Sequence, residues 1–129
     1  MFDFRLRQHQ SDTMSLGWAE SNLRQMKEED SMIVRTWRGW TRPEDADRYA
    51  SYIEDTGLAA YRTTPGNHGA YLTSRPDGDK TEFLTISFWD SEESIRGFAG
   101  DDIEAAVFYP EDDQFLVARE TFVRHYHVH

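Results

Sequence analysis

The pattern of apolar and polar positions divides the chain into two parts at Met32. The first part, residues 1–31, begins with the alternating stretch FDFRLRQ, which is typical of a short strand. A helical stripe follows it and contains Leu16, Ala19, Leu23 and Met26. The second part has stronger and more regular signals. We therefore expect an N-terminal extension over residues 1–31, an arm that packs on a single domain over residues 32–129.

Within residues 32–129 the sequence predicts strands and helices in the order β-α-β-β-α-(α)-β. Runs rich in β-branched and aromatic residues indicate strands, and acidic first turns followed by apolar stripes indicate helices. The expected strands are residues 32–40, 70–75, 81–89 and 115–129, and the expected helices are 41–57, 90–98 and 101–109. This order is the ferredoxin-like arrangement, an α+β fold with a four-stranded antiparallel sheet and helices on one of its faces.

Turn-forming and capping residues set the expected boundaries of these elements. The pair Asp77-Gly78 predicts a tight hairpin between the two middle strands. Gly57 is expected to end the first helix, and residues 58–69 are expected to form a loop. Asp90 and Glu93 have the spacing of a capping box at the start of the second helix.

The third expected strand, TEFLTISFW, has two faces of different character. One face is apolar and consists of Leu84, Ile86 and Phe88. The other is mixed and consists of Phe83, Thr85, Ser87 and Trp89. Because the helices cover only one side of such a sheet, the other side is left bare unless a partner covers it. We therefore expect a homodimer that buries the apolar face.

Charge and composition narrow the possible partners. The chain has 24 acidic and 14 basic residues and a net charge of −10, which disfavours nucleic acid and anionic membranes as partners. It contains no cysteine, so disulfides and thiolate chemistry are not available to it. No apolar run approaches the roughly 18 residues of a membrane helix, and the N-terminus lacks the apolar region of a signal peptide. We expect a soluble, cytoplasmic protein.

The chain ends in VRHYHVH, in which three histidines alternate with other residues. On a strand, His125 and His127 would point to one face, and His68 or a carboxylate would have to complete a metal site. Two histidines without a placed third ligand are a weak metal motif, and we predict no metal. One alternative is that an imidazole forms hydrogen bonds in a pocket. Another is that His125 is a general base, since the unperturbed pKa of histidine is about 6.5.

Three stretches resemble the antibiotic biosynthesis monooxygenase family. They are FLTISFWDSEESIRGFAG, TGLAAYRTTPGNHGAYL and DDIEAAVFYPEDD, and the resemblance covers residues 32–128. It implies the dimeric α/β barrel of that family, in which two sheets pack face to face and each subunit keeps a pocket between its sheet and its helices. It also implies oxygen-dependent chemistry on aromatic compounds such as polyketide anthrones, without metal, flavin or haem.

The functional residues of that family are only partly retained in this sequence. Of the four residues proposed for quinone formation, the tryptophan at the end of the strand is kept as Trp89. The asparagine four positions earlier is replaced by Thr85, the tyrosine six positions later by Ile95, and the arginine position falls near Tyr109. In the haem-degrading branch the iron-binding histidine would fall at Phe108, so the resemblance implies no haem.

The pattern and the resemblance together give a candidate site. Trp89 and His125 are the expected catalytic residues, with His125 as the base. The expected substrate-binding residues are Thr85, Trp37, Trp40, Tyr109, Arg35 and His68. Trp37 and Trp40 lie on opposite faces of the first strand, so at most one of them can face the pocket. The expected function is monooxygenation of a small polyketide- or quinol-like aromatic substrate without a cofactor. The alternative is a non-catalytic dimeric protein that binds a small aromatic molecule in the same pocket.

Overall fold

The structure, a computed structural model, describes residues 32–129, and the expected arm at residues 1–31 lies outside this range. Its strands are β1 (Ile33–Thr41), β2 (Asn67–Asp77), β3 (Lys80–Trp89), β4 (Leu116–Arg119) and β5 (Arg124–His127). Its helices are α3 (Ala46–Ile53), α4 (Ala59–Thr63) and α5 (Glu92–Ala99), with a π turn, η2 (Glu54–Leu58), and two 3-10 helices, η1 (Pro43–Asp45) and η3 (Pro110–Gln114). None of the helices between residues 32 and 129 has the length and apolar character needed to cross a lipid bilayer.

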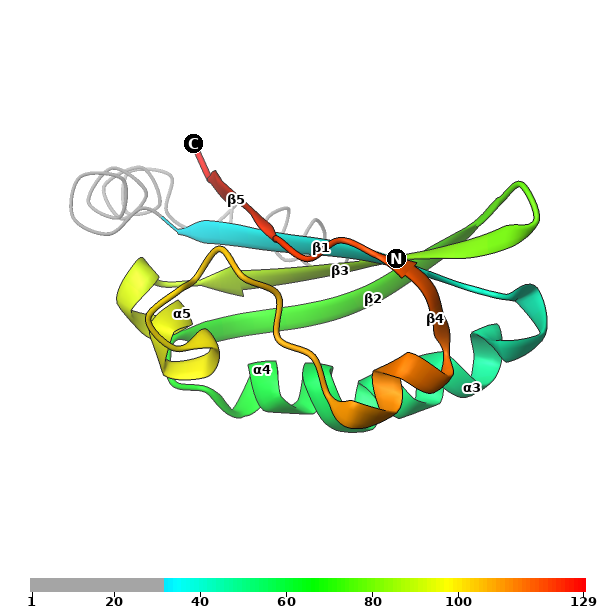
Figure 1. Cartoon of the computed structure of the whole chain (residues 1–129). Helices are drawn as coiled ribbons and strands as arrows, with labels where there is room; N and C mark the ends of the chain where they lie inside the picture. The colour runs from blue at the N-terminus through cyan, green and yellow to red at the C-terminus, as the bar shows by residue number, and fades with distance from the viewer. Residues whose placement is uncertain (1–31) are drawn as a thin grey trace, which may run out of the picture.

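The strands form one antiparallel sheet in the order β2-β3-β1-β4, and β5 pairs with the first half of β1. The helices all lie on one side of this sheet, below it in Figure 1. This arrangement confirms the predicted ferredoxin-like α+β fold. The hairpin between β2 and β3 turns at Gly78, whose φ of 62° suits glycine, and Asp77 pairs with Lys80 on either side of it.

The first helix does not end at Gly57, as the sequence predicted. It continues through the π turn η2 and α4 as far as Thr63, and β2 begins at Asn67. The helix continues because Leu58 and Tyr61 point into the core, where their exposed fractions are 0% and 8%. Burying two such side chains outweighs the cost of about 1 kcal/mol for a glycine inside a helix.

The third predicted helix, at residues 101–109, is wrong. This segment contains only turns and one isolated bridge, between Ala105 and Phe122. Its backbone groups bond to other parts of the chain: the Ala106 N–H donates to the Thr121 carbonyl, and the Val123 N–H donates to the Glu104 carbonyl. Groups that are used in this way are not available for the i to i−4 bonds of a helix.

Two smaller predictions also need correction. The final strand is not continuous from 115 to 129 but breaks at Glu120, whose carboxylate accepts hydrogen bonds from the backbone and guanidinium of Arg38. The N-cap of α5 is Ser91 rather than Asp90, and Ser91 forms a capping box with Ser94. Serine caps this helix because its hydroxyl accepts the backbone N–H of Ser94 at 3.2 Å.

The two faces of the sheet differ as the sequence predicted. On the helix side, Phe83, Thr85, Ser87 and Trp89 of β3 are all buried. On the other side, Leu84, Ile86 and Phe88 are only partly buried, and Tyr126 of β5 is 52% exposed. The helices therefore leave an apolar sheet face that a single copy of residues 32–129 does not cover.

Candidate functional site

A small cavity lies between the sheet and the helices. Its volume is about 40 Å³, and it is bordered by β1, β3, the first helical region, α5 and the segment that precedes β4. Six aromatic rings line it: Trp37, Tyr49, Tyr61, Phe98, Phe108 and Tyr109. A cavity of this size holds a few water molecules or a diatomic gas, whereas a cavity of about 150 Å³ is needed for benzene.

The sheet side of the cavity is formed by Trp37 and Thr85, which face each other across β1 and β3. The Trp37 indole N–H donates to the Glu120 carbonyl at 2.7 Å, and its ring meets Phe108 edge to face at 6.1 Å. Gly39 makes room for this ring, since a Cβ at that position would lie 2.3 Å from Trp37 Cη2. The glycine and the hydrogen bond together fix the indole in the cavity wall.

The helix side of the cavity depends on the π turn. Gly57 lines the cavity within this turn, and a Cβ there would lie 3.9 Å from the ring of Tyr109. π turns are frequent at functional sites because they push one residue out of the regular helical register. Gly57, which the sequence identified only as a helix end, therefore belongs to the wall of the cavity.

Asp112 is the ionisable carboxyl group of the cavity. It is 5% exposed, lies on η3, and accepts the backbone N–H of Tyr109 at 2.7 Å. Burial raises the pKa of Asp112 above its ordinary value of 3.8, and the hydrogen bond from Tyr109 offsets only part of this effect. A buried carboxyl with a raised pKa at a cavity is a candidate for proton transfer.

Asp112 is not among the site residues that the sequence predicted. The stretch PEDD reads as a polar turn, in which acidic residues are ordinary caps, and Asp112 does cap η3 in this way. Its neighbours Glu111 and Asp113 are exposed, and nothing in the sequence distinguishes the buried acid from them. The packing of Phe115 and Leu116, both 9% exposed, turns this side of η3 toward the core.

Arg35 and His125 lie at the other end of the same sheet side. Arg35 is 1% exposed, and its guanidinium donates to the carbonyls of Ile103 and Ala105. It also donates to His125 Nε2 at 3.0 Å, and Glu104 lies 3.2 Å from His125 Nδ1. Neither Arg35 nor His125 lines the cavity, and Phe98, whose ring centroid is 6.0 Å from the Arg35 guanidinium, borders it instead.

The contacts of His125 define its protonation state. A guanidinium can only donate, so Nε2 must accept, and the remaining proton sits on Nδ1, where it is donated to Glu104. Burial and the charge of Arg35 lower the pKa of His125 below 6.5, while Glu104 raises it in part. The imidazole is therefore neutral, and the lone pair of Nε2, which a general base would need, accepts the hydrogen bond from Arg35.

Of the other predicted site residues, some line the cavity, one is buried behind it and one lies on the opposite face of the sheet. Thr85, Trp37 and Tyr109 line it. Trp89 is completely buried behind it, donates to Ser87 Oγ at 2.9 Å, and packs on the cavity residue Tyr61 at 5.7 Å. Trp40 lies on the opposite sheet face, where its indole donates to Asp77 at 2.9 Å.

His68 and the terminal histidines lie away from the cavity. His68, which the sequence predicted as a substrate-binding residue, lies where the chain pairs with the end of β3, and its imidazole bonds to Asp90 at the surface. His127 and His129 are exposed. Across residues 32–129, no three His, Cys, Asp or Glu side chains gather in a way that could hold a metal ion.

The comparisons with known proteins agree with this fold. The family model described as antibiotic biosynthesis monooxygenase matches residues 32–105. A Bacillus cereus protein named as a candidate monooxygenase of this kind is 13% identical, with a TM-score of 0.53 over 76% of this chain and 93% of its own. A Chloroflexus aurantiacus protein of the same description is 15% identical, with a TM-score of 0.53 over 77% of this chain and 94% of its own. No curated protein matches the sequence. At these identities the structural matches establish the fold alone.

Proposed function

Because the chain belongs to the antibiotic biosynthesis monooxygenase family, we propose that it oxidises a small, uncharged hydroxyaromatic compound with O2 and that Asp112 is the base. The observation that carries this proposal is a buried carboxyl with a raised pKa at a cavity lined by aromatic rings. A raised pKa makes the carboxylate a stronger base than an ordinary aspartate, so it can take a proton and return it later in the same turnover.

The lining of the cavity favours an uncharged ligand. Its ionisable groups are Asp112 and three tyrosines, and no Lys, Arg or His side chain of residues 32–129 lines it. A carboxylate, sulfate or phosphate on the ligand would therefore be buried beside Asp112 with no cationic side chain of residues 32–129 in the cavity wall. A phenol or a ring ketone can instead share a hydrogen bond with Asp112, Tyr109 or Thr85 and stack on the aromatic walls.

The proposed reaction converts a ring CH2 group beside a phenol into a carbonyl. Asp112 takes a proton from this carbon, and the resulting carbanion gives one electron to O2, which forms a substrate radical and superoxide. These two combine into a peroxide anion, which takes the proton back from Asp112. The O–O bond then breaks with loss of water and leaves the C=O group. The sum is CH2 plus O2 giving C=O plus H2O, and the apolar walls keep water from the radicals.

In this proposal His125 is not the base, in contrast to the sequence-based prediction. Its Nε2 accepts from Arg35, and neither residue lines the cavity, which Phe98 borders 6.0 Å from the Arg35 guanidinium. Thr85 and Tyr109 are kept as substrate-binding residues and Trp37 as a stacking surface. Trp89 supports the wall through Tyr61 and Phe98.

The test compares Asp112→Asn with Asp113→Asn, using anthrone as the probe and measuring O2 uptake and quinone formation. Asparagine at 112 can still accept the Tyr109 N–H but cannot take a proton, so turnover should fall by about 10²-fold or more. Asp113 is exposed on the same short helix, with 78% of its side chain accessible, and its replacement should leave turnover unchanged. Equal turnover in wild type and Asp112→Asn would refute the role of Asp112.

The alternative function is a non-catalytic protein that binds small aromatic molecules. It is favoured by the loss of three of the four family residues, whose positions fall at Thr85, Ile95 and near Tyr109, and Ile95 is completely buried and has no polar group. Under this alternative, phenols would quench the fluorescence of Trp37 and bind in the micromolar range, but none would consume O2. Binding without O2 uptake over a panel of phenols, anthrones and quinols would favour it.

The assembly proposed for the protein is a homodimer through the sheet face that carries Leu84, Ile86 and Phe88. A partner sheet would cover these side chains, which the helices leave partly exposed. The mass in solution at micromolar concentration should be that of two chains, and Ile86→Lys should shift it toward one. The cytoplasmic location and the absence of nucleic acid from the partners stay predictions from composition.

A further inference from the structure

The segment between α5 and η3 closes one side of the cavity without helix or strand of its own. It spans residues 100–109, and its last four residues, Ala106 to Tyr109, line the cavity. In Figure 1 it runs in yellow and orange across the helix side of the sheet. Since the closed cavity of about 40 Å³ is too small for an aromatic ring, this segment has to move if such a ligand is to enter.

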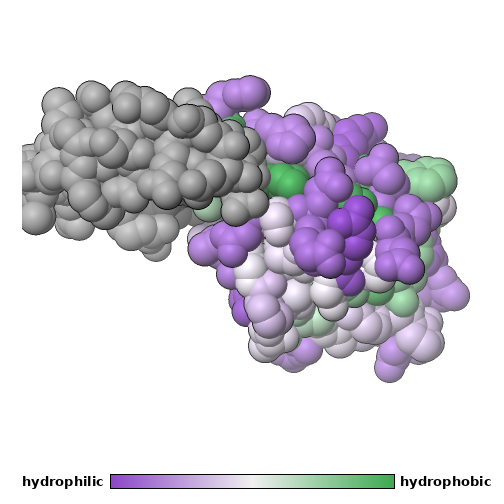
Figure 2. All heavy atoms as spheres, turned by 90° about the vertical axis from the view of Figure 1, so that its left-hand side faces the viewer, coloured by the Kyte–Doolittle hydropathy of each residue, from purple (hydrophilic) through white to green (hydrophobic). Residues whose placement is uncertain are grey.

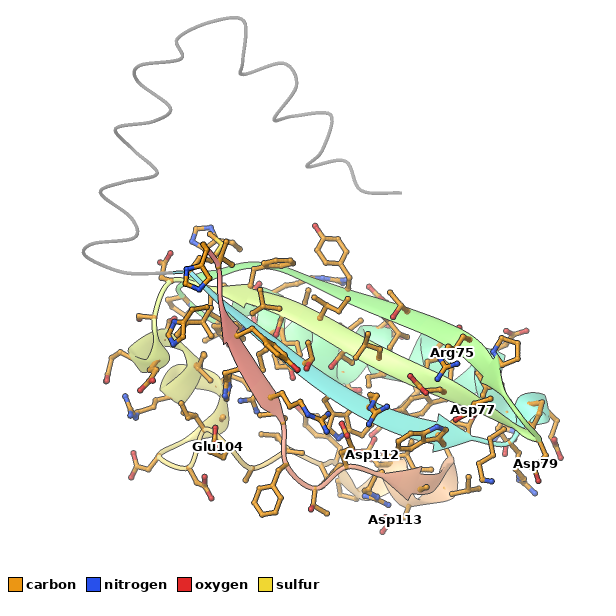
Figure 3. All side chains as sticks on the ribbon, turned by 90° about the horizontal axis from the view of Figure 1, so that it is seen from above. Arg75, Asp77, Asp79, Glu104, Asp112 and Asp113 are labelled. Carbon is orange, nitrogen blue, oxygen red and sulfur yellow. The ribbon has the colours of Figure 1, made fainter. Side chains whose placement is uncertain are left out.

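Arg35 joins the segment to β1, in addition to the two backbone hydrogen bonds that tie Glu104 and Ala106 to Val123 and Thr121. Two of its carbonyls, at Ile103 and Ala105, accept from the two Nη atoms of this one guanidinium. Between them Glu104 points outward, and its carboxylate, with 68% of the side chain exposed, meets His125 Nδ1. Figure 3 shows Glu104 near α5, whereas Asp112 lies further along the chain toward β4. The attachment is therefore separate from the carboxyl of the cavity.

The attachment works only while His125 is neutral. Arg35 Nη1 donates to His125 Nε2, and a proton on Nε2 would place two donors and two positive charges 3.0 Å apart. Among residues 32–129, no carboxylate is bonded to Arg35 and its Nε is buried without a hydrogen-bond partner, so the described residues offer the guanidinium no other acceptor at this point. Protonation of His125 therefore has to displace either the imidazole or the guanidinium.

We propose that Arg35, His125 and Glu104 form a pH-sensitive latch that holds residues 103–105 against the sheet in neutral solution and releases them when His125 is protonated. Release frees the carbonyls of Ile103 and Ala105 and loosens the cavity wall that follows them. The latch gives the protein a way to open its cavity, and this role goes beyond the proposed oxidation. The latch can be tested whether or not the protein oxidises a ligand, because the quantity measured is the motion of the backbone.

The direction of the pH effect follows from the groups around His125. Arg35 on β1 disfavours its protonation, whereas Glu104 on the segment and Glu92 on α5 favour it. Burial is the largest cause and acts in the same direction as Arg35, so the pKa of His125 in the closed state lies below its ordinary value of 6.5. In the opened state this value returns toward normal. The latch is therefore fully closed above pH 6.5 and weakens as the pH falls through the pKa of the closed state.

Acid can reach His125 from the surface. Of its side chain 13% is exposed, and Glu104 next to it is open to water. Figure 2 shows the end of the molecule that carries α5, and hydrophilic side chains dominate its described surface. Protonation therefore does not require prior unfolding of the domain.

The test is amide hydrogen exchange of the full chain at about pH 8 and about pH 5, corrected for the intrinsic pH dependence of exchange. Two amides report on the segment: Ala106, which donates to Thr121, and Val123, which donates to Glu104. In the wild type their corrected exchange should be faster by a factor of about three or more at the lower pH. Amides of β3, which do not depend on the latch, should keep their protection.

Three variants separate the latch from general acid destabilisation. His125→Asn keeps an acceptor for Arg35 and a donor for Glu104 but cannot be protonated, so the pH dependence at Ala106 and Val123 should disappear. His127→Asn, an exposed histidine of the same strand, should leave it unchanged. Glu104→Gln removes the charge that favours protonation and should move the transition to lower pH. Exchange that does not change with pH in the wild type, or that changes equally in His125→Asn, would overturn the latch.

Discussion

Two buried charged groups lie on the helix side of the same sheet, and they differ in what surrounds them. Asp112 is 5% exposed and borders a cavity, and its carboxylate accepts the backbone N–H of Tyr109. Arg35 is 1% exposed, lies away from the cavity, and donates to two carbonyls and an imidazole. The carboxyl oxygens of Asp112 can therefore still accept a hydrogen bond from a ligand. The N–H groups of Arg35 instead donate mostly to other groups of the protein.

The comparison shows that burial of a charge does not by itself mark a catalytic group. The sequence pointed to Arg35 and His125 as ligand-binding and catalytic groups, but the structure joins them to each other and to backbone carbonyls. No pattern in the sequence distinguishes Asp112 from the acids next to it, yet it lines the cavity. A functional assignment depends on whether the polar atoms of the group remain open to a ligand.

The largest effect is expected at Arg35. Arg35→Met fills the space but leaves the carbonyls of Ile103 and Ala105 without donors, which should lower the free energy of unfolding by about 3 kcal/mol or more. Arg38→Met is the control, because Arg38 lies on the same strand with 36% of its side chain exposed and pairs with Glu120. This change should cost no more than about 1 kcal/mol. If urea titrations show that both variants lose a similar free energy of unfolding, Arg35 does not have the special structural role proposed for it.

The next effect is expected at the cavity end of β1. Gly39→Ala places a methyl group 2.3 Å from Trp37 Cη2, so the indole has to leave its place in the wall. Overpacking of this kind costs about 1–3 kcal/mol. The displaced indole should also change the intensity and wavelength of tryptophan emission. Unchanged emission and an unchanged free energy of unfolding would mean that the side chains around Gly39 can move enough to accommodate the methyl group.

A smaller effect is expected behind the cavity, at Ser87. Its hydroxyl accepts the indole N–H of Trp89 at 2.9 Å, and both side chains are completely buried. Ser87→Ala leaves that N–H without a partner and should cost about 1–2 kcal/mol in thermal or urea unfolding. Ser87→Thr, which keeps the hydroxyl, should recover part of the loss. A neutral Ser87→Ala would show that the N–H finds another acceptor.

The smallest effect on stability is expected at Asp112, and its sign is opposite. Because the pKa of Asp112 is higher in the folded protein than its ordinary 3.8, the folded state holds the proton more tightly. Its contribution to the free energy of unfolding is therefore complete below pH 3.8 and is lost as the pH rises through the folded pKa. Asp112→Asn should remove this loss and leave the free energy of unfolding at neutral pH unchanged or higher. A clear destabilisation at neutral pH would mean that the charged form is favoured in the fold.

Most of the fold could be predicted from the sequence, because alternation and turn residues act locally. The alternation in IVRTWRGWT and TEFLTISFW placed the central strands β1 and β3, and Asp77-Gly78 placed the hairpin between β2 and β3. The errors occurred where distant groups compete with local preference. The burial of Leu58 and Tyr61 carries the first helix past Gly57, and bonds to Arg35, Thr121 and Val123 keep residues 101–109 out of a helix.

The sequence by itself determined the α+β fold, the apolar sheet face and the residues that share each face of a strand, since these follow from the period of the side chains. It also provided Thr85 and Trp37, which lie opposite each other at the cavity. Only the tertiary structure decided which acid is buried, which tryptophan faces the cavity, and that His125 is bound to Arg35. These properties depend on contacts between residues as far as 90 positions apart, so they cannot be predicted from a local pattern of side chains.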